Sequence, residues 1–234
     1  MAIAFVVPCY NEAKRTNFET FKSWQRDHPE VSFYFVNDGS SDNTLEVLKN
    51  SFDDAFLLNL SENSGKAEAV RLGMVKVSEL AHYSHIGFFD ADLATPLDEL
   101  PEFVKKAESG FKVILGSRIL RLGGQVKRKW YRHYLGRLFA TVASSILKLP
   151  VYDTQCGAKL FDSKVLKEVI TEPFISKWIF DVELIFRLRN LEAINLNDYY
   201  EVPLSSWEDV GGTSLKWTDF LKAPFELWQL FMRY

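Results

Sequence analysis

Short apolar runs alternate with segments of helical spacing along the first part of the chain. The apolar runs cover residues 3–7, 31–36, 56–60 and 85–89, and the segments of helical spacing cover 18–24, 44–49 and 66–80. Strands that are apolar on both faces and alternate with helices are typical of an α/β fold, with a mostly parallel sheet flanked by helices. Ligands in such folds bind beyond the carboxyl ends of the strands.

Composition indicates a globular protein and excludes some classes of function, but it does not identify a ligand. The 234 residues, 47% of them hydrophobic and 25% charged, suffice for one large globular domain. The net charge of −3 argues against nucleic acid as a partner of the whole surface. Cys9 and Cys156 give no disulfide framework, so a reduced, cytoplasmic compartment is expected. No apolar segment has the length of a membrane span.

The first polar cluster, at residues 8–12, follows the first predicted strand. Tyr10 can stack on a nucleobase, and Glu12 can accept a hydrogen bond from a base or a ribose. The alternative interpretation is a simple strand exit with a carboxylate at the start of a helix.

The second cluster, at residues 37–44, follows the second predicted strand. Ser41 or Asp42 can cap the next helix, so neither requires a functional explanation. Asp38 stands earlier, at the strand tip, where capping does not require it. Its carboxylate can accept a hydrogen bond from the imide N–H of uracil or from a ribose hydroxyl group.

The third cluster is Asp90-Ala91-Asp92, at the end of the run 85–89. Two carboxylates so close repel each other, and burial increases the cost. A divalent cation removes this objection, and hard oxygen ligands suit Mg²⁺ or Mn²⁺ bridging a diphosphate. Because alternate strand residues point to opposite faces, a turn is needed for both aspartates to reach one ion. The alternative is a strand exit into a helix cap.

Together, the order aromatic-Asn-Glu, Asp-Gly-Ser and Asp-Ala-Asp resembles the inverting family 2 glycosyltransferases, which have the GT-A fold. The resemblance covers nearly the whole chain. It implies a site for a nucleotide-sugar donor, with Asp90 serving both this site and the metal site. The expected nucleotide-site residues are Pro8, Tyr10, Glu12, Asp38, Lys66 and Asp90, and the expected metal ligands are Asp90 and Asp92. For Lys66, a contact with phosphate competes with a solvated lysine in the first turn of a helix.

The second half of the chain narrows the resemblance. Segments 115–118, 153–161 and 178–184 look like those of the dolichyl-phosphate glucosyltransferase and polyprenyl-phosphate glycosyltransferase branch, whose acceptor is a lipid monophosphate. UDP-glucose is the donor that this resemblance favours. The late segment 207–216 departs from the branch because its lysine is displaced. A soluble hydroxyl acceptor therefore stays an alternative, as does a non-catalytic protein that binds sugar nucleotides.

The distribution of charge along the chain supports an anionic acceptor independently of the family resemblance. Residues 118–152 contain eight Lys or Arg residues and no Asp or Glu, in a chain that is acidic overall. Such a segregated basic span indicates a phosphate or an anionic surface. We expect Arg118 and Arg132 to bind the acceptor phosphate.

Asp181 has a role that depends on the acceptor. A hydroxyl acceptor needs a carboxylate base, and Asp181 is the candidate. A phosphate acceptor is already ionised, and Asp181 then orients sugar hydroxyl groups. Glu183 is expected to pair with Arg187, four residues further along a helix. The presence of Asp90, Asp92 and Asp181 argues against the non-catalytic alternative.

The C-terminal segment 217–234 is expected to follow a glycosyltransferase domain of residues 1–216. Its apolar residues recur at helical spacing, with aromatic residues prominent and Lys216, Lys222 and Arg233 flanking them. Such a helix can lie in the headgroup region of a bilayer, which predicts peripheral binding to the cytoplasmic membrane face. The alternative is that the same apolar face packs on the protein core. Pro224 is expected to kink or split the helix.

Overall fold

The computed structural model describes residues 1–127, 130–210 and 217–234, with the backbone alone described at 127, 130–133, 135 and 217–224. Within these residues seven strands form a central sheet in the order β3-β2-β1-β4-β7-β5-β8. The strands are β1 (Ile3–Cys9), β2 (Val31–Asp38), β3 (Leu57–Leu60), β4 (His85–Phe89), β5 (Val113–Ser117), β7 (Ala158–Asp162) and β8 (Tyr199–Pro203). β7 runs antiparallel to both neighbours, β4 and β5, and the other pairs are parallel. The expected α/β fold is confirmed.

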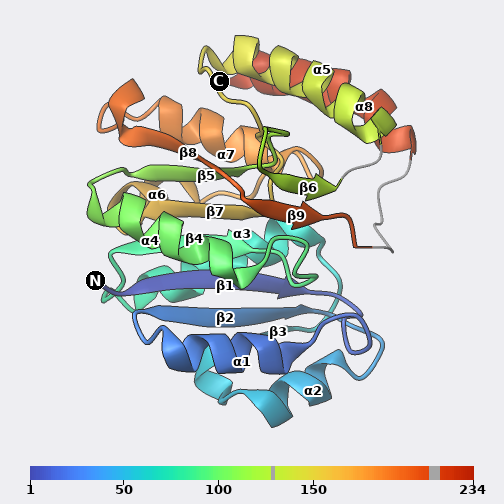
Figure 1. Cartoon of the computed structure of the whole chain (residues 1–234), viewed down its shortest axis with the longest axis vertical. Coiled ribbons are helices and arrows are strands. Elements are labelled where there is room, and N and C mark those ends of the chain that lie inside the picture. Colours follow the sequence, from blue (N-terminus) through green and yellow to red (C-terminus); the bar gives the residue numbers. More distant parts are fainter. Residues whose placement is uncertain (128–129, 211–216) are drawn as a thin grey trace.

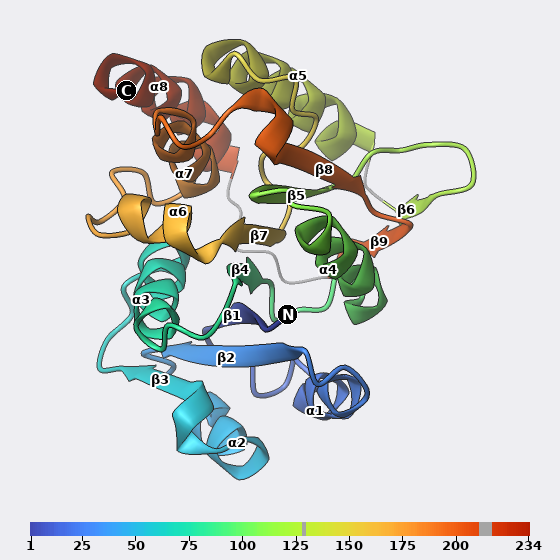
Figure 2. The ribbon, with the colours of Figure 1, turned by 90° about the vertical axis from the view of Figure 1, so that its left-hand side faces the viewer.

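Helices cover both faces of this sheet, as Figures 1 and 2 show. α1 (Phe18–Asp27) and α4 (Leu100–Glu108) lie on one face, and α3 (Lys66–Glu79), α6 (Ser163–Val169) and α7 (Phe180–Arg189) lie on the other. α2 (Thr44–Ser51) lies at the β3 end, and α5 (Trp130–Leu147) and α8 (Trp217–Arg233) lie side by side at the β8 end. Short 3₁₀ turns at Asp54–Phe56, Leu97–Glu99 and Leu196–Asp198 and the parallel pair β6 (Gln125–Lys127) and β9 (Ser206–Glu208) complete the described elements.

Alternate residues of the central strands enter two separate cores. On β1, Ala4 and Val6 pack in the core that includes α3 and α7, whereas Ile3, Phe5 and Val7 pack in the core that includes α1 and α4. All five side chains are completely buried. A strand covered on both faces has no polar side, which is why the sequence of β1 is an unbroken apolar run.

Gly73 lets α3 approach the sheet closely. A Cβ atom at this position would lie 2.4 Å from Cγ1 of Val6 and 2.8 Å from Cγ2 of Val36. Only a residue without a side chain fits this distance. Because α3 runs back across the sheet from the carboxyl ends of the strands, this packing fixes its first residue, Lys66, at that edge.

The last described helix, α8, runs through Pro224 as one helix, so the expected division into two helices is wrong. Leu227 and Leu230 are buried in the same core as α3 and α7. The predicted core packing of the C-terminal segment is therefore present, while Trp228 and Phe231 stay exposed. The domain boundary between residues 216 and 217 stays a prediction. Among the described helices, none combines the length and the apolar character needed to cross a bilayer.

Candidate active site

The loops after β1 and β2 are bound to each other. Asn11 adopts a left-handed conformation with φ of 56°, and its Oδ1 accepts a hydrogen bond from the backbone N–H of Ser41 at 2.9 Å. Oγ1 of Thr44 accepts from the backbone N–H groups of Glu12 at 2.8 Å and Ala13 at 3.0 Å. The polar residues around position 42 therefore join the two strand exits into one platform, beyond their role at the start of α2.

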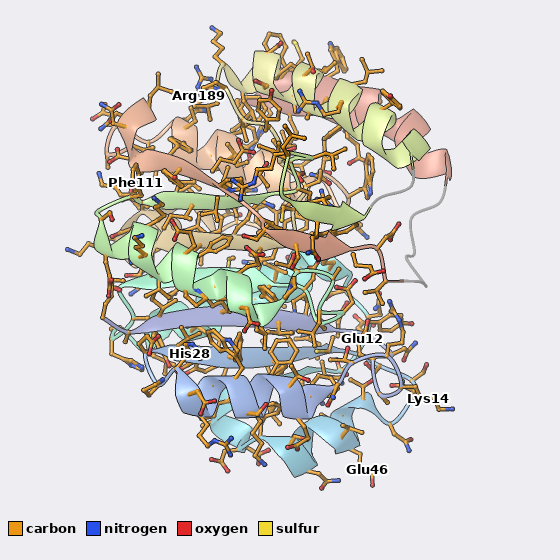
Figure 3. All side chains as sticks on the ribbon, in the orientation of Figure 1. Glu12, Lys14, His28, Glu46, Phe111 and Arg189 are labelled. Carbon is orange, nitrogen blue, oxygen red and sulfur yellow. The ribbon has the colours of Figure 1, made fainter. Side chains whose placement is uncertain are left out.

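Two predicted nucleotide-site residues differ in their availability on this platform. Tyr10 is 47% exposed, so its ring is open to a stacking partner. Glu12 is buried, and its carboxylate accepts from Arg15 Nη1 at 2.9 Å and from Thr16 Oγ1 at 3.0 Å. Burial raises the pKa of Glu12 above its ordinary value. Figure 3 shows Glu12 beyond the carboxyl end of β1, at the side of the molecule opposite Phe111. Pro8 lies one residue before the end of β1 and is partly buried.

Asp38 organises the loop that leads into α3. Its Oδ1 accepts from the backbone N–H and the hydroxyl of Ser64, both at 2.7 Å. Its Oδ2 accepts from the backbone N–H of Gly65 at 2.9 Å and from Nδ2 of Asn63 at 3.1 Å. The side chain is almost completely buried. The predicted contact with a nucleoside stays a prediction, and the structure adds a role that the sequence did not reveal, because Asp38 sets the position of residues 63–65.

Asp90 and Asp92 leave β4 through a turn at residues 91–92, the geometry that both need to face one ion. Asp90 is fixed by its backbone N–H, which donates to the carbonyl of Gly157 at 2.9 Å. Its carboxylate lies over Gly157, where a Cβ atom would come within 2.0 Å of Oδ2. Oδ1 of Asp92 accepts from the backbone N–H of Ala94 at 3.0 Å.

Lys66 reaches Asp90 from the first turn of α3. Its Nζ lies 2.5 Å from Oδ1 of Asp90, so the lysine is not simply a solvated first-turn residue. Burial lowers the pKa of Lys66, but the negative charges of Asp90 and Asp181 more than offset this and raise it overall. The lysine is therefore charged and 44% exposed at the side chain, available to an anionic ligand.

Asp181, in the first turn of α7, is paired with a residue that sequence reasoning missed. Its Oδ1 lies 2.5 Å from Nζ of Lys159 on β7, and Lys159 is completely buried. Burial raises the pKa of Asp181, and the charges of Lys159 and Lys66 oppose this. The signal that was available is a charged residue within the apolar run of β7, at 158–161.

Arg118 is held by Asp153, a second residue that the sequence did not single out. Nε and Nη2 of Arg118 donate to the two carboxylate oxygens of Asp153 at 2.6 and 2.8 Å. The guanidinium carbon lies 5.3 Å from the ring centroid of Trp207. Burial lowers the pKa of Arg118, and the charge of Asp153 more than reverses this effect. The predicted contact of Arg118 with an acceptor phosphate stays a prediction. The side chain of Arg132 lies outside the described part of the molecule.

The predicted pairing of Glu183 with Arg187 is confirmed, at 2.7 Å from Oε1 to Nη2. Glu183 also accepts from the backbone N–H groups of Ile175 and Ser176 and from the hydroxyl of Tyr234. This completely buried carboxylate therefore ties α7 to the preceding loop and to the residue that follows α8.

The residues at the end of β4 fit a divalent cation. Burial and the neighbouring charge of Asp90 raise the pKa of Asp92, because two carboxylates lie close together at this edge. Lys66 compensates one of these negative charges through its contact with Oδ1 of Asp90, and a cation would compensate the other. The described residues contain no group of three or more His, Cys, Asp or Glu side chains arranged around one point. Two carboxylates with remaining ligands from a diphosphate and water is the arrangement that Mg²⁺ usually adopts.

Comparison with known proteins decides the family. The model of Glycosyl transferase family 2 matches residues 4–170. The chain belongs to glycosyltransferase family 2. A dolichyl-phosphate beta-glucosyltransferase of Trichomonas vaginalis is 32% identical over 97% of this chain and 69% of its own length. The dolichyl-phosphate beta-glucosyltransferase of Drosophila melanogaster is 28% identical over 100% of this chain and 76% of its own length.

Solved structures confirm the GT-A fold of this glycosyltransferase. Glucosyl-3-phosphoglycerate synthase from Mycobacterium tuberculosis in complex with UDP has a TM-score of 0.68 and 15% identity, covering 99% of this chain and 79% of that one. The same enzyme in complex with Mn²⁺, UDP and phosphoglyceric acid has a TM-score of 0.71 and 14% identity, covering 99% and 78%. At such identity the likeness establishes the fold alone.

The family match divides the candidate site. Residues from Pro8 to Lys159 lie within the matched range, so they include both strand-exit loops, Lys66 and the two aspartates. Asp181 lies beyond it, on α7, which the alignment with the Drosophila melanogaster relative covers.

We expect Asp38→Ala to weaken UDP binding by about tenfold or more, because it removes the carboxylate that we predict to accept a hydrogen bond from the nucleoside. Isothermal calorimetry with UDP measures this. Ser64→Ala is the matched control, since it removes one hydrogen bond to Asp38 and keeps the carboxylate. Similar losses in both variants would show that Asp38 acts through the loop at 63–65, and unchanged affinity in Asp38→Ala would remove it from the site.

Proposed function

We propose that this enzyme transfers glucose from UDP-glucose to dolichyl phosphate or a related polyprenyl phosphate, with inversion at the anomeric carbon and with Mg²⁺ or Mn²⁺ as cofactor. The observation that carries the proposal is the match to enzymes named dolichyl-phosphate beta-glucosyltransferase, at 25–32% identity over 91–100% of this chain. These alignments extend over the acceptor half of the site as well as the donor half.

The donor half offers a separate contact to each part of a nucleotide sugar. The exposed ring of Tyr10 can stack on the base, and Asp38 and Glu12 lie at the adjoining strand ends. Asp90 and Asp92 would hold the cation, which when bound screens the charge of the leaving diphosphate. Lys66 adds a further positive charge beside them. Asp181 lies close enough to this group for its charge to affect Lys66.

The acceptor determines which chemistry the protein must supply. A phosphate monoester is already ionised, so an oxygen of the acceptor phosphate attacks the anomeric carbon from the face opposite the diphosphate. The bond from that carbon to the UDP oxygen breaks, and UDP leaves with the electron pair. No side chain has to remove a proton. Arg118 and Arg132, in the acid-free basic span, are the proposed contacts to the acceptor phosphate.

A lipid acceptor requires a membrane surface, and the α5–α8 pair offers a suitable face. A groove of 220 Å³ between these helices is lined by Val142, Ile146, Leu227, Trp228 and Phe231. Trp228 and Phe231 are more than half exposed. Aromatic and aliphatic side chains of this kind enter the headgroup region of bilayers, and the basic span 118–152 lies partly on helix α5. We propose peripheral binding of this face to the cytoplasmic membrane surface.

The proposed reaction is tested with radiolabelled UDP-glucose and other sugar nucleotides against dolichyl phosphate, undecaprenyl phosphate and soluble hydroxyl acceptors. We expect product on the lipid phosphates that requires Mg²⁺ or Mn²⁺, and a loss of about 100-fold or more in kcat for Asp92→Asn. Asp98→Asn, an exposed aspartate on the following turn, is the control and should be neutral. Full activity in EDTA would contradict the metal, and product on soluble acceptors alone would contradict the lipid.

The acceptor contacts predict a selective change in KM. Arg118→Met combined with Asp153→Asn removes the guanidinium without leaving a buried unpaired carboxylate, and Arg132→Gln removes the second positive charge. We expect each to raise the KM for dolichyl phosphate by about tenfold or more, because each loses a charge-assisted contact to phosphate. The KM for UDP-glucose should change little. Equal increases for donor and acceptor would show that the arginines serve the diphosphate instead.

Membrane binding is tested by sedimentation with liposomes that contain anionic lipid, at low salt where electrostatic attraction is least screened. We expect the intact chain to pellet and the double variant Trp228→Ser/Phe231→Ser to stay in the supernatant. Point variants are preferable to removal of α8, because Leu227 and Leu230 are part of the core. Leu80→Ser, at an exposed leucine at the end of α3, is the control. An intact chain that does not pellet would contradict the proposed surface.

A further inference from the structure

Lys159 is a completely buried lysine in the middle of the central sheet. It lies on β7 opposite Phe88 of β4 and Leu115 of β5, and 0% of the residue is exposed. An ammonium group loses its hydration in such a place, and this loss is tolerated only if the charge is well paired. The contacts of Lys159 therefore bear directly on why a charged residue occupies this strand.

Three groups from different elements surround the ammonium. Nζ lies 2.5 Å from Oδ1 of Asp181 at the start of α7, and it donates to the carbonyl of Cys156 at 2.5 Å. It also lies 5.0 Å from the centre of the Phe88 ring, within the range of a cation–π interaction. The charge is thus held from a helix, a loop and a strand, which leaves it little freedom to move.

A second ion pair lies near the same ring. Nζ of Lys66 lies 5.8 Å from the centre of the Phe88 ring and is paired with Asp90. The pair of Lys66 and Asp90 is 44% and 32% exposed at the side chains, whereas that of Lys159 and Asp181 is 0% and 7% exposed. The first pair can therefore exchange partners when a ligand binds, and the second is fixed.

Packing alone does not explain the fixed pair. Buried ion pairs are often no more stabilising than apolar residues of similar volume, and the other residues of β7 at 158, 160 and 161 are apolar. Nζ of Lys159 and Nζ of Lys66 lie 5.0 and 5.8 Å from the centre of the Phe88 ring. Since Lys159 contacts Asp181, the carboxylate of Asp181 lies close to the more exposed pair. A carboxylate that is locked on one side and borders a ligand site is suited to accept hydrogen bonds from that ligand.

We infer that Lys159 is a positioning residue that holds Asp181 in one orientation, so that Asp181 accepts hydrogen bonds from the hydroxyl groups of the donor sugar. The inference rests on the proposed nucleotide-sugar donor and goes beyond it, because it gives the buried Lys159 the role of fixing the carboxylate of Asp181 for recognition of the sugar. It follows that Lys159 contributes to the affinity for UDP-glucose and does not contribute to the affinity for UDP.

The test compares four proteins: wild type, Lys159→Met, Asp181→Asn and the double variant Lys159→Met/Asp181→Asn. Calorimetry in the presence of Mn²⁺ measures the dissociation constants of UDP and of UDP-glucose for each. We expect UDP-glucose binding to weaken by about tenfold or more in each single variant, and no further in the double variant, because both residues act through one hydrogen-bonding group. UDP binding should stay within about twofold of wild type, because UDP lacks the glucose that Asp181 is proposed to bind.

Thermal unfolding of the same four proteins separates positioning from a structural role. Each single variant leaves one buried charge without its partner and should lower the melting temperature, whereas the double variant restores a neutral pair and should recover much of it. Recovery of the melting temperature without recovery of UDP-glucose affinity supports the inference. Recovery of both together would overturn it, as would equal losses for UDP and UDP-glucose or normal UDP-glucose binding by Lys159→Met.

These outcomes are distinct from failure of the proposed function. A wild-type protein that binds UDP-glucose but does not glycosylate a lipid phosphate contradicts the acceptor, and the variants then still decide the role of Lys159. A wild-type protein that does not bind UDP-glucose contradicts both the donor and the inference.

Discussion

Asp90 stands where three parts of the fold meet, and it contacts them through both its backbone and its carboxylate. Its backbone N–H joins β4 to the segment before β7, and its carboxylate takes the ammonium of Lys66 from α3. Asp92 lies two residues further on and increases the negative charge at the same edge. Carboxylates brought so close need positive charges nearby. Lys66 supplies one positive charge through Asp90, and the buried Lys159 supplies another through Asp181. A cation bound to a diphosphate would compensate the remaining negative charge.

The sheet explains why this concentration of charge is tolerated. Every strand that delivers a polar residue is covered on both faces, so the strands are rigid and their ends cannot spread apart. Gly73 brings α3 against β1 and β2, and Asp38 fixes the loop from which α3 starts. Lys66 therefore reaches Asp90 from a backbone whose position is set by packing and hydrogen bonds on both sides.

The sequence was informative wherever a residue's role depends on its position at a strand end. Apolar runs followed by polar clusters predicted β1, β2, β4 and the place of Asp38, Asp90 and Asp92, because strand exits in such sheets converge. Partners distant in sequence could not be predicted. Nothing around Arg118 points to Asp153, and nothing around Asp181 points to Lys159, since both pairs form only when β7 and its flanking loops enter the sheet. The charged residue inside the apolar run of β7 was the one visible trace.

The same limit applies to the C-terminal segment. Its periodicity predicted an apolar face, but periodicity does not say whether that face meets lipid or protein. The structure divides the face: Leu227 and Leu230 enter the core, and Trp228 and Phe231 line the groove beside α5. The hydroxyl of Tyr234 then joins this helix to Glu183 of α7, two residues after Asp181. The helix α8 and the helix that carries Asp181 are thus connected through one buried carboxylate.

The antiparallel placement of β7 has a consequence for how the enzyme acquires its structure during synthesis. β5 pairs with β7 and β8, while β4 pairs with β1 and β7, so β7 lies between two strands that both precede it in the chain. The strands β1 to β4 can associate as soon as they leave the ribosome, whereas β5 has no edge to join until residues 158–162 are made. Long-range pairing of this kind is slow because the intervening chain must first be ordered. The strands β1 to β4 can therefore pair first in the nascent protein, and Asp181 can meet Lys159 only after β7 and the start of α7 have been made.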